Sequence, residues 1–133
     1  MSDYTVKRID EMEAVYRDAF KRARASLGVE SFGMNVLDIP PNTDQYPEHD
    51  HAEDGQEEVY LPLRGSGEIE IEGERIPLEI DTMVRVGPGT KRKIWTGDEP
   101  LRLLAIGATP GEVYEAPDFS KLGAPDPLAQ QQS

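Results

Sequence analysis

Residues 57–76 read EEVYLPLRGSGEIEIEGERI, and the second half of this stretch decides the fold class. From Glu68 to Ile71, isoleucines alternate with glutamates, the two-residue period of a β-strand with one face in a core and the other in water. The polar sequence EGER at 72–75 contains a glycine and is typical of a tight hairpin turn. The stretch therefore predicts two antiparallel strands joined by a hairpin.

The same signature extends in both directions from this hairpin. Short runs rich in apolar and β-branched residues recur from Ser31 onward, separated by Gly, Pro and Asp, so we predict an all-β domain, an antiparallel jelly roll. Pro62 cannot donate a ladder hydrogen bond, which predicts a bulge, an edge or a strand end there. The expected strands are FGMNVLDI (32–39), the run around PEHDH (47–51), EEVYLPL (57–63), GEIEIEG (67–73), RIPLEI (75–80), TMVRV (82–86), KRKIW (91–95) and LRLLAIG (101–107).

The segment before this domain has a different period. Apolar residues from Ile9 to Leu27 recur at spacings of three and four, which predicts an N-terminal amphipathic α-helix. Asp10 and Glu13 resemble a capping pair at its start, and Gly28 supplies a left-handed stop at its end. Its polar face, expected to be solvated, carries Arg17, Lys21, Arg22 and Arg24.

The chain thus divides into three parts. A helical extension occupies residues 1–30, a β-barrel residues 31–110, and a Pro-rich C-terminal tail residues 111–133, which we expect to pack partly on the barrel. A chain of 133 residues suits one hydrophobic core and therefore one site.

Charge and composition exclude several classes of function. Fourteen Lys and Arg against 26 Asp and Glu give a net charge of −12, which repels nucleic acid and anionic membranes, so we expect neither as a partner. No apolar run is long enough to span a bilayer and the start lacks a secretory signal, so we expect a cytoplasmic protein. Without cysteine, any metal must be bound by nitrogen and oxygen.

Both histidines of the chain lie in EHDH, residues 48–51. Residues two apart in a strand share a face, so His49 and His51 would project together, and an antiparallel return would place Glu58 opposite them. Two imidazoles and a carboxylate suit a divalent transition metal (Fe, Mn, Zn, Ni or Co) and leave coordination positions open. The alternative is a pair of solvated histidines in an acidic loop.

The order HDH (49–51), EEVYLPLRGSGEIEIEGE (57–74) and DTMVRVGPGT (81–90) resembles the cupin superfamily, and the whole chain resembles its small single-domain bacterial members of undefined activity. The first motif of that family is His-x-His, a short loop, Glu, six residues and Gly, and Glu58 to Gly65 keeps the last spacing. The resemblance implies a double-stranded β-helix barrel, usually dimeric, with a divalent metal on three histidines and one glutamate.

The chain departs from that pattern at the fourth ligand. Residues 82–92 are a loose counterpart of the second motif, and its histidine is replaced by Arg92, which stays protonated and cannot bind a metal. Arg92 is expected to face inward near Glu58. It would either neutralise Glu58 in a metal-free pocket or offer its planar fork to an anionic ligand. Tyr60 shares the face of Glu58, as barrel lining or as a ligand-binding residue.

Three functions stay open on this evidence. The protein could be a metal-dependent oxygenase, isomerase or lyase acting on a small anionic molecule, a non-catalytic protein binding the same molecule, or a metal-free cupin that binds a partner and has a His, Glu and Arg salt-bridged pocket. The open sheet edges and the amphipathic segment also predict a homodimer.

Overall fold

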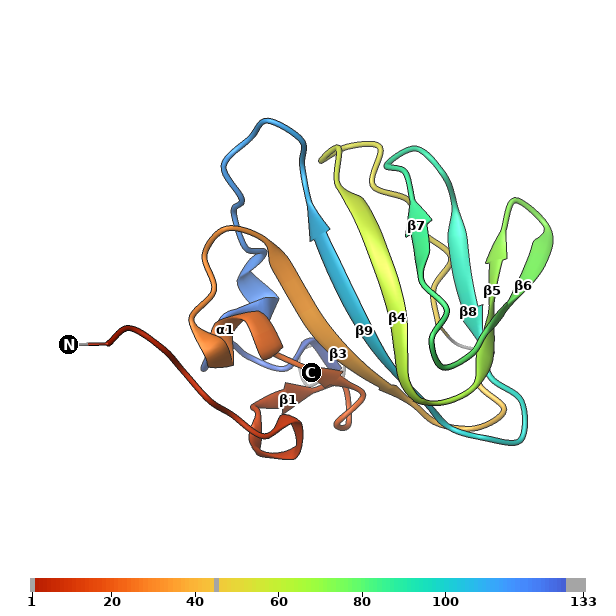
Figure 1. Ribbon diagram of the computed structural model, residues 1–133, viewed down its shortest axis with the longest axis horizontal. Coiled ribbons are helices and arrows are strands. Elements are labelled where there is room, and N and C mark those ends of the chain that lie inside the picture. Colours follow the sequence, from red (N-terminus) through yellow and green to blue (C-terminus); the bar gives the residue numbers. More distant parts are fainter. Residues whose placement is uncertain (1, 45, 129–133) are drawn as a thin grey trace.

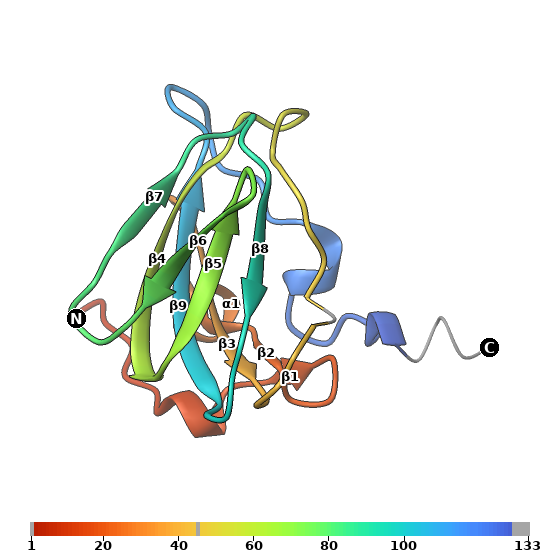
Figure 2. The same cartoon turned by 90° about the vertical axis from the view of Figure 1, so that its right-hand side faces the viewer.

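Two antiparallel sheets face each other and form the walls of a barrel (Figures 1 and 2). The structure, a computed structural model, describes residues 2–44 and 46–128. The larger sheet has six strands in the order β1-β2-β3-β9-β4-β7, and the smaller has three in the order β6-β5-β8. Their bounds are β1 Ala14–Val15, β2 Phe20–Lys21, β3 Gly33–Ile39, β4 Glu57–Gly65, β5 Gly67–Ile71, β6 Glu74–Leu78, β7 Val84–Val86, β8 Arg92–Trp95 and β9 Leu101–Ala108.

The core lies between the two sheets because alternate residues of each strand point inward. In β9, Leu101, Leu103 and Ala105 are buried while the residues between them are partly exposed. They pack against inward residues of the small sheet, including Ile69 and Ile94, in one apolar cluster. The predicted all-β jelly roll is therefore confirmed.

The turns occur where the sequence predicts them. Glu72 and Gly73 have φ values of 51° and 85°, so the EGER hairpin joins β5 to β6 through two left-handed residues. The pairing of β4 with β9 shifts between Pro62 and Arg64, so of the three alternatives predicted at Pro62 the bulge is the one that forms. At Gly65 φ is 81° and a Cβ atom would lie 1.9 Å from the Pro100 carbonyl oxygen, so only glycine fits this corner.

The run around PEHDH is the one predicted strand that forms no strand. It makes a single antiparallel bridge, between His49 and Arg92. The seven other predicted strands are present, with ends that differ by up to two residues.

The predicted N-terminal helix over residues 9–27 is wrong for most of its length. The segment forms a short 3-10 helix, η1 (Ile9–Glu11), the hairpin of β1 and β2, and a single α-helix, α1 (Ala23–Leu27). Only the end of the prediction holds, since Gly28 follows α1 in the left-handed conformation. No helix in residues 2–44 and 46–128 is long and apolar enough to cross a membrane.

The reason for this error is a turn that a helix cannot contain. Tyr16, Arg17 and Asp18 all have positive φ, between 55° and 68°, and reverse the chain between β1 and β2. Phe20 then pairs with Leu37, so the hairpin extends the sheet at the edge of β3. Satisfying this open edge outweighs the helical preference of the segment.

Two residues of the predicted solvated face, Lys21 and Arg22, are buried, whereas Arg17 is exposed as predicted. Arg22 is 1% exposed, because the C-terminal tail with its 3-10 helix η2 (Asp118–Ser120) covers it. Its Nε donates to the Phe119 carbonyl at 2.9 Å and its Nη2 to the Ala124 carbonyl at 3.0 Å. Its Nη1 donates to the Glu13 carboxylate, so Arg22 fastens the tail to the N-terminal hairpin. The last five residues of the predicted tail, 129–133, lie outside the described residues.

Candidate metal centre

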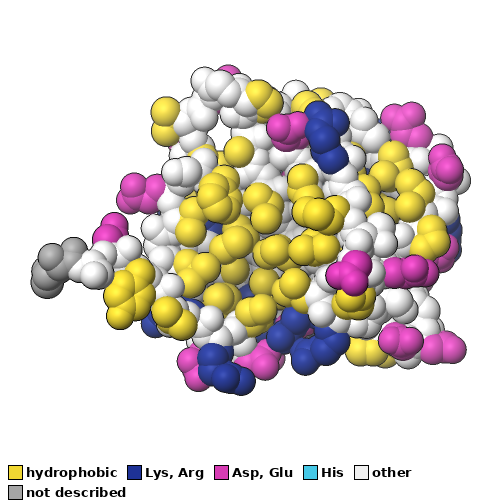
Figure 3. Space-filling view, in the orientation of Figure 1, with side chains coloured by type: hydrophobic (Ala, Val, Ile, Leu, Met, Phe, Trp, Pro, Cys, Tyr) yellow, Lys and Arg dark blue, Asp and Glu magenta, His cyan; other side chains and the backbone are white. Residues whose placement is uncertain are grey.

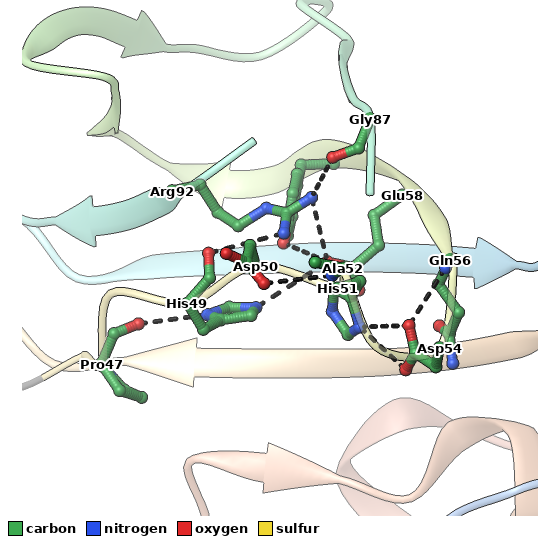
Figure 4. Close-up of polar contacts among 11 residues, drawn as sticks. Pro47, His49, Asp50, His51, Ala52, Asp54, Gln56, Glu58, Gly87 and Arg92 are labelled. Atoms are coloured by element: carbon green, nitrogen blue, oxygen red, sulfur yellow. Dashed lines mark hydrogen bonds and ion pairs between the residues drawn. The ribbon is translucent and has the colours of Figure 1, made fainter. Parts of the chain in front are cut away.

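Three side chains from two segments meet at one end of the barrel (Figure 4). His49 and His51 come from the loop that precedes β4, and Glu58 is the second residue of β4. One potential ligand atom of each lies within 4.8 Å of the other two. The structure therefore brings together the three residues that the sequence singles out.

The histidines reach this position by a pairing that the sequence did not predict. The His49 amide donates to the Arg92 carbonyl at 3.0 Å, and the Arg92 amide donates back at 2.9 Å. The His51 amide donates to the Pro88 carbonyl at 2.7 Å. The segment is thus fastened to β8 and the loop before it, whereas β4 pairs with β7 and β9. Glu58 faces the histidines across the barrel.

Both imidazoles are oriented by acceptors on their outer nitrogens. His49 Nδ1 lies 3.1 Å from the Pro47 carbonyl oxygen, and His51 Nδ1 lies 3.1 and 3.2 Å from the Asp54 carboxylate oxygens. A carbonyl or carboxylate oxygen only accepts, so each Nδ1 carries a proton, and Nε2 is the nitrogen of each ring that faces Glu58 and is available to a metal once it is deprotonated. This arrangement is typical of metal-binding histidines.

The Nε2 atoms of both histidines point toward a single carboxylate oxygen. His51 Nε2 lies 3.1 Å from Glu58 Oε1, and His49 Nε2 lies 3.9 Å from it. The two histidine side chains are 20% and 31% exposed, so solvent and small solutes reach the site from their side. Two imidazole nitrogens and a carboxylate oxygen fit a divalent transition metal better than Ca²⁺ or Mg²⁺.

Tyr60 lies behind Glu58 on the same face of β4, as the alternation predicts. Its hydroxyl donates to Glu58 Oε1 at 2.6 Å, and the residue is almost fully buried. Tyr60 also belongs to the apolar core cluster. Tyr60 therefore lines the barrel, and its hydroxyl contacts the candidate metal ligand Glu58.

Burial and mutual contacts shift the acidities of these groups. Burial alone would raise the pKa of Glu58, but the contacts with His49, His51 and Tyr60 outweigh it and hold this pKa well below its ordinary value. The pKa of His51 is raised by its hydrogen bond to Glu58 and also by Asp54, against the effect of burial. Burial chiefly raises the pKa of the Tyr60 hydroxyl. Glu58 is thus a carboxylate, and Tyr60 a neutral donor, at neutral pH.

Arg92 lies beside this group with its guanidinium completely buried. Its Nη2 donates to the Gly87 carbonyl at 3.2 Å and lies 3.9 Å from Glu58 Oε1, while Nη1 is 3.5 Å from the His49 carbonyl oxygen. Its Nε has no hydrogen-bond partner among residues 2–44 and 46–128. The inward orientation of Arg92 and its closeness to Glu58 agree with the sequence prediction.

Two acceptors of the site were not predicted, and only one leaves a signal in the sequence. Asp54 follows His51 by three residues and also accepts from the Gln56 amide at 3.0 Å, which is a common use of aspartate in a turn. The Pro47 acceptor is a backbone carbonyl, so no side-chain pattern reveals it. The Tyr46 ring also borders the site, with its centroid 5.8 Å from that of His49, whereas Glu57 pairs with Arg85 on the outer face of the sheet.

Solved structures share the barrel. A cupin protein from Bacteroides fragilis aligns with a TM-score of 0.67 and 25% identity, over 88% of this chain and 93% of its own. A sugar phosphate isomerase of the cupin superfamily from Silicibacter pomeroyi aligns with a TM-score of 0.66 and 19% identity, over 78% and 75%. A predicted oxalate decarboxylase from Thermotoga maritima aligns with a TM-score of 0.53 and 22% identity, over 59% and 68%.

Sequence comparison agrees with the fold. No curated protein matches the chain, but the profile of the Cupin_2 family, the cupin domain, matches residues 35–107. This match spans more than half of the chain and includes both histidines, Glu58 and Arg92. The chain therefore belongs to the cupin domain family.

Proposed function

We propose that this cupin binds a divalent transition metal through His49, His51 and Glu58, and a small anionic molecule beside it. The observation that carries the proposal is the orientation of the two imidazoles. Pro47 and Asp54 accept from the two Nδ1 atoms, which leaves both Nε2 atoms directed toward Glu58 Oε1, where a metal ion would take the place of an Nε2 proton. Solvated loop histidines would have no reason to share this arrangement.

The chain's own residues have distinct tasks in this proposal. His49, His51 and Glu58 hold the ion, and Tyr60 orients Glu58 through its hydroxyl. A metal bound here would act as a Lewis acid toward a small ligand at its open positions. The exposed edges of the histidines give that ligand its route of entry.

The charge of the site favours an anion. Glu58 and Arg92 carry opposite charges 3.9 Å apart and cancel, so the charge of a divalent ion would remain uncompensated in a partly buried site. An anionic ligand supplies the missing negative charge. The Silicibacter pomeroyi neighbour is a sugar phosphate isomerase, and the Thermotoga maritima neighbour is a predicted oxalate decarboxylase. Sugar phosphates and oxalate are both small anions, which supports this ligand class.

The proposal includes two modes of action. The chain is either a metal-dependent oxygenase, isomerase or lyase of that anion, or a protein that binds it without turnover. Product analysis after incubation with a bound anion under air separates the two modes.

Metal binding is tested on protein purified without an affinity tag. After chelation, calorimetric titration with Mn²⁺, Fe²⁺, Ni²⁺, Co²⁺ or Zn²⁺ should show one site, and saturation should raise the melting temperature. At an ion concentration of 100 times Kd, the folded state gains about 2.7 kcal/mol. Small dicarboxylates, keto acids and sugar phosphates should then bind to the loaded protein and not to the chelated one.

Glu58→Gln and Glu57→Gln form a matched pair for this titration. Glu57 is adjacent in sequence but pairs with Arg85 on the outer face, so its replacement should leave the metal affinity unchanged. Glu58→Gln should weaken binding at least tenfold. Equal affinities in both variants, or failure of all five ions to bind the parent protein, would contradict the proposed site.

A further inference from the structure

Asp54, the acceptor for His51 Nδ1, lies in a loop whose other hydrogen bonds are short-range. Residues 52–56 join His51 to β4 (Figure 4). The Gly55 amide donates to the His51 carbonyl oxygen at 2.8 Å. The Gln56 amide donates to an Asp54 carboxylate oxygen at 3.0 Å. Both bonds join neighbours along the chain, so they shape the turn and do not fix it against the barrel.

Packing gives this loop little support on its outer side. In Figure 3, apolar side chains gather over the middle of the molecule and acidic ones lie at its margins. The loop is itself acidic, with Glu53 and Asp54, and an open cavity of about 780 Å³ lies between it and tail residues 112–115. The Asp54 side chain is 49% exposed. The position of the loop therefore depends on hydrogen bonds to the barrel.

A threonine after β9 supplies a hydrogen bond of this kind. Thr109 directly follows β9, and the end of this strand lies beside the loop at one end of the barrel (Figures 1 and 2). Its Oγ1 donates to the Asp54 carbonyl oxygen at 2.7 Å. Its methyl carbon Cγ2 would lie 3.3 Å from a Cβ atom at Gly55, so the methyl group packs against this glycine. Among the described residues, no other side chain from outside residues 50–56 makes a hydrogen bond to the loop.

From these contacts we infer that Thr109 is a positioning residue of the metal centre, which fixes the Asp54 backbone and thereby keeps the Asp54 carboxylate on His51 Nδ1. An acceptor on the outer nitrogen of a metal-binding histidine orients the ring and raises its basicity, so a group that holds the acceptor in place contributes to metal affinity. This role rests on the proposed metal site. Thr109 lies outside residues 35–107, the stretch that matches the family profile.

The two branches of the Thr109 side chain can be removed separately. Thr109→Val keeps the methyl contact with Gly55 and loses the hydroxyl, so it should weaken Zn²⁺ binding by about three- to tenfold. Thr109→Ser keeps the hydroxyl and should retain the parent affinity. Thr82→Val makes the same change at a half-buried threonine before β7, at the end of that strand remote from Glu58, and should leave the affinity unaltered. Calorimetric titration of chelated protein measures all three variants.

The effect of Thr109→Val should pass through Asp54. In protein that already carries Asp54→Ala, Thr109→Val should change the zinc affinity by less than about twofold, because there is no carboxylate left to position. In protein that carries Tyr60→Phe, which acts on Glu58, it should cause its full loss of affinity. Losses that add fully in the Asp54→Ala protein would overturn the inference.

The imidazole rings report the same contact without metal. In chelated protein labelled with ¹⁵N-histidine, only His49 and His51 contribute ring signals to the nuclear magnetic resonance spectrum. Thr109→Val should shift the ring nitrogen signals of His51 toward those of the Asp54→Ala protein and leave those of His49 unchanged. Unchanged His51 signals, or equal zinc affinities of Thr109→Val and Thr82→Val, would overturn the inference. Failure of the parent protein to bind any ion would instead contradict the proposed function, and the ring signals would still decide whether Thr109 positions Asp54 on His51.

Discussion

Two buried arginines at different places in the molecule have very different surroundings. Arg22 has a partner at every nitrogen: two backbone carbonyls of the tail and the carboxylate of Glu13. Arg92, which is just as buried, has one good carbonyl acceptor, a carboxylate at 3.9 Å and an Nε with no partner in the part of the chain that the structure describes. A buried charge is tolerated only when it is compensated. The comparison teaches that Arg22 has a structural role, whereas Arg92 keeps N–H donors that a bound ligand could use.

The largest expected effect is on the fully partnered arginine. Arg22→Met leaves the Glu13 carboxylate and two tail carbonyls without their donor, and should lower the free energy of unfolding by about 3 to 5 kcal/mol. Urea denaturation measures this change. Arg85→Met removes the same charge from an exposed pair and should cost less than about 1 kcal/mol. Equal losses of unfolding free energy in the two variants would contradict the structural role of Arg22.

The second effect sharpens the contrast. In chelated protein, Arg92→Met should cost only about 1 to 3 kcal/mol, because Glu58 keeps its contacts with His51 and Tyr60. The same variant should bind metal more tightly, since a positive charge next to Glu58 has gone, and bind small anions more weakly. Arg92→His should shift both affinities in the same directions, because it adds a possible metal ligand and removes the guanidinium that would bind the anion. If calorimetry finds neither affinity changed, Arg92 has no part in binding the metal or the anion.

A third, smaller effect concerns Tyr60. Tyr60→Phe removes the 2.6 Å hydrogen bond to Glu58 and should weaken metal binding about tenfold, with a stability loss of about 1 kcal/mol. Tyr46→Phe, which keeps the ring packed on His49 and removes only its hydroxyl, is the control and should alter the metal affinity less. A metal affinity that is unaffected by Tyr60→Phe would mean that Glu58 needs no orienting partner.

The smallest effect is on pH dependence and involves His51. Its pKa is raised in the metal-free fold, so it contributes stability below its ordinary pKa of about 6.5 that is lost as pH rises through the raised value. Metal requires the neutral imidazole, so metal affinity should change in the opposite direction and increase over the same interval. Asp54→Asn should move both transitions to lower pH. Titrations of stability and affinity that change in the same direction would contradict this assignment.

The parts of the fold that depend on local pattern were predictable from sequence. Alternation between Gly67 and Ile71 identifies a half-buried strand wherever it lies in the barrel, and a glycine in a four-residue linker identifies a hairpin. The helix over residues 9–27 could not be distinguished from a hairpin, because the left-handed turn at Tyr16–Asp18 uses no glycine. Arg22 was placed in solvent because nothing local indicates that the tail covers it.

The candidate site was predictable in its membership and not in its construction. His49, His51 and Glu58 are recognisable by residue type and spacing, and they do converge. The strand pairing expected to bring them together is absent, and hydrogen bonds to Arg92 and Pro88 hold the histidines instead. Such contacts join backbone groups more than 35 residues apart, which no local pattern specifies.

The most direct test of the central claim is X-ray absorption spectroscopy of parent protein that has been chelated and then loaded with one equivalent of Zn²⁺. Ligation by His49, His51 and Glu58 predicts a first shell with two imidazole nitrogens at about 2.0 to 2.1 Å, completed by oxygen. A chain of net charge −12 could instead attract the ion to surface carboxylates. A shell of oxygen atoms alone, without the outer scattering of imidazole rings, would contradict the account.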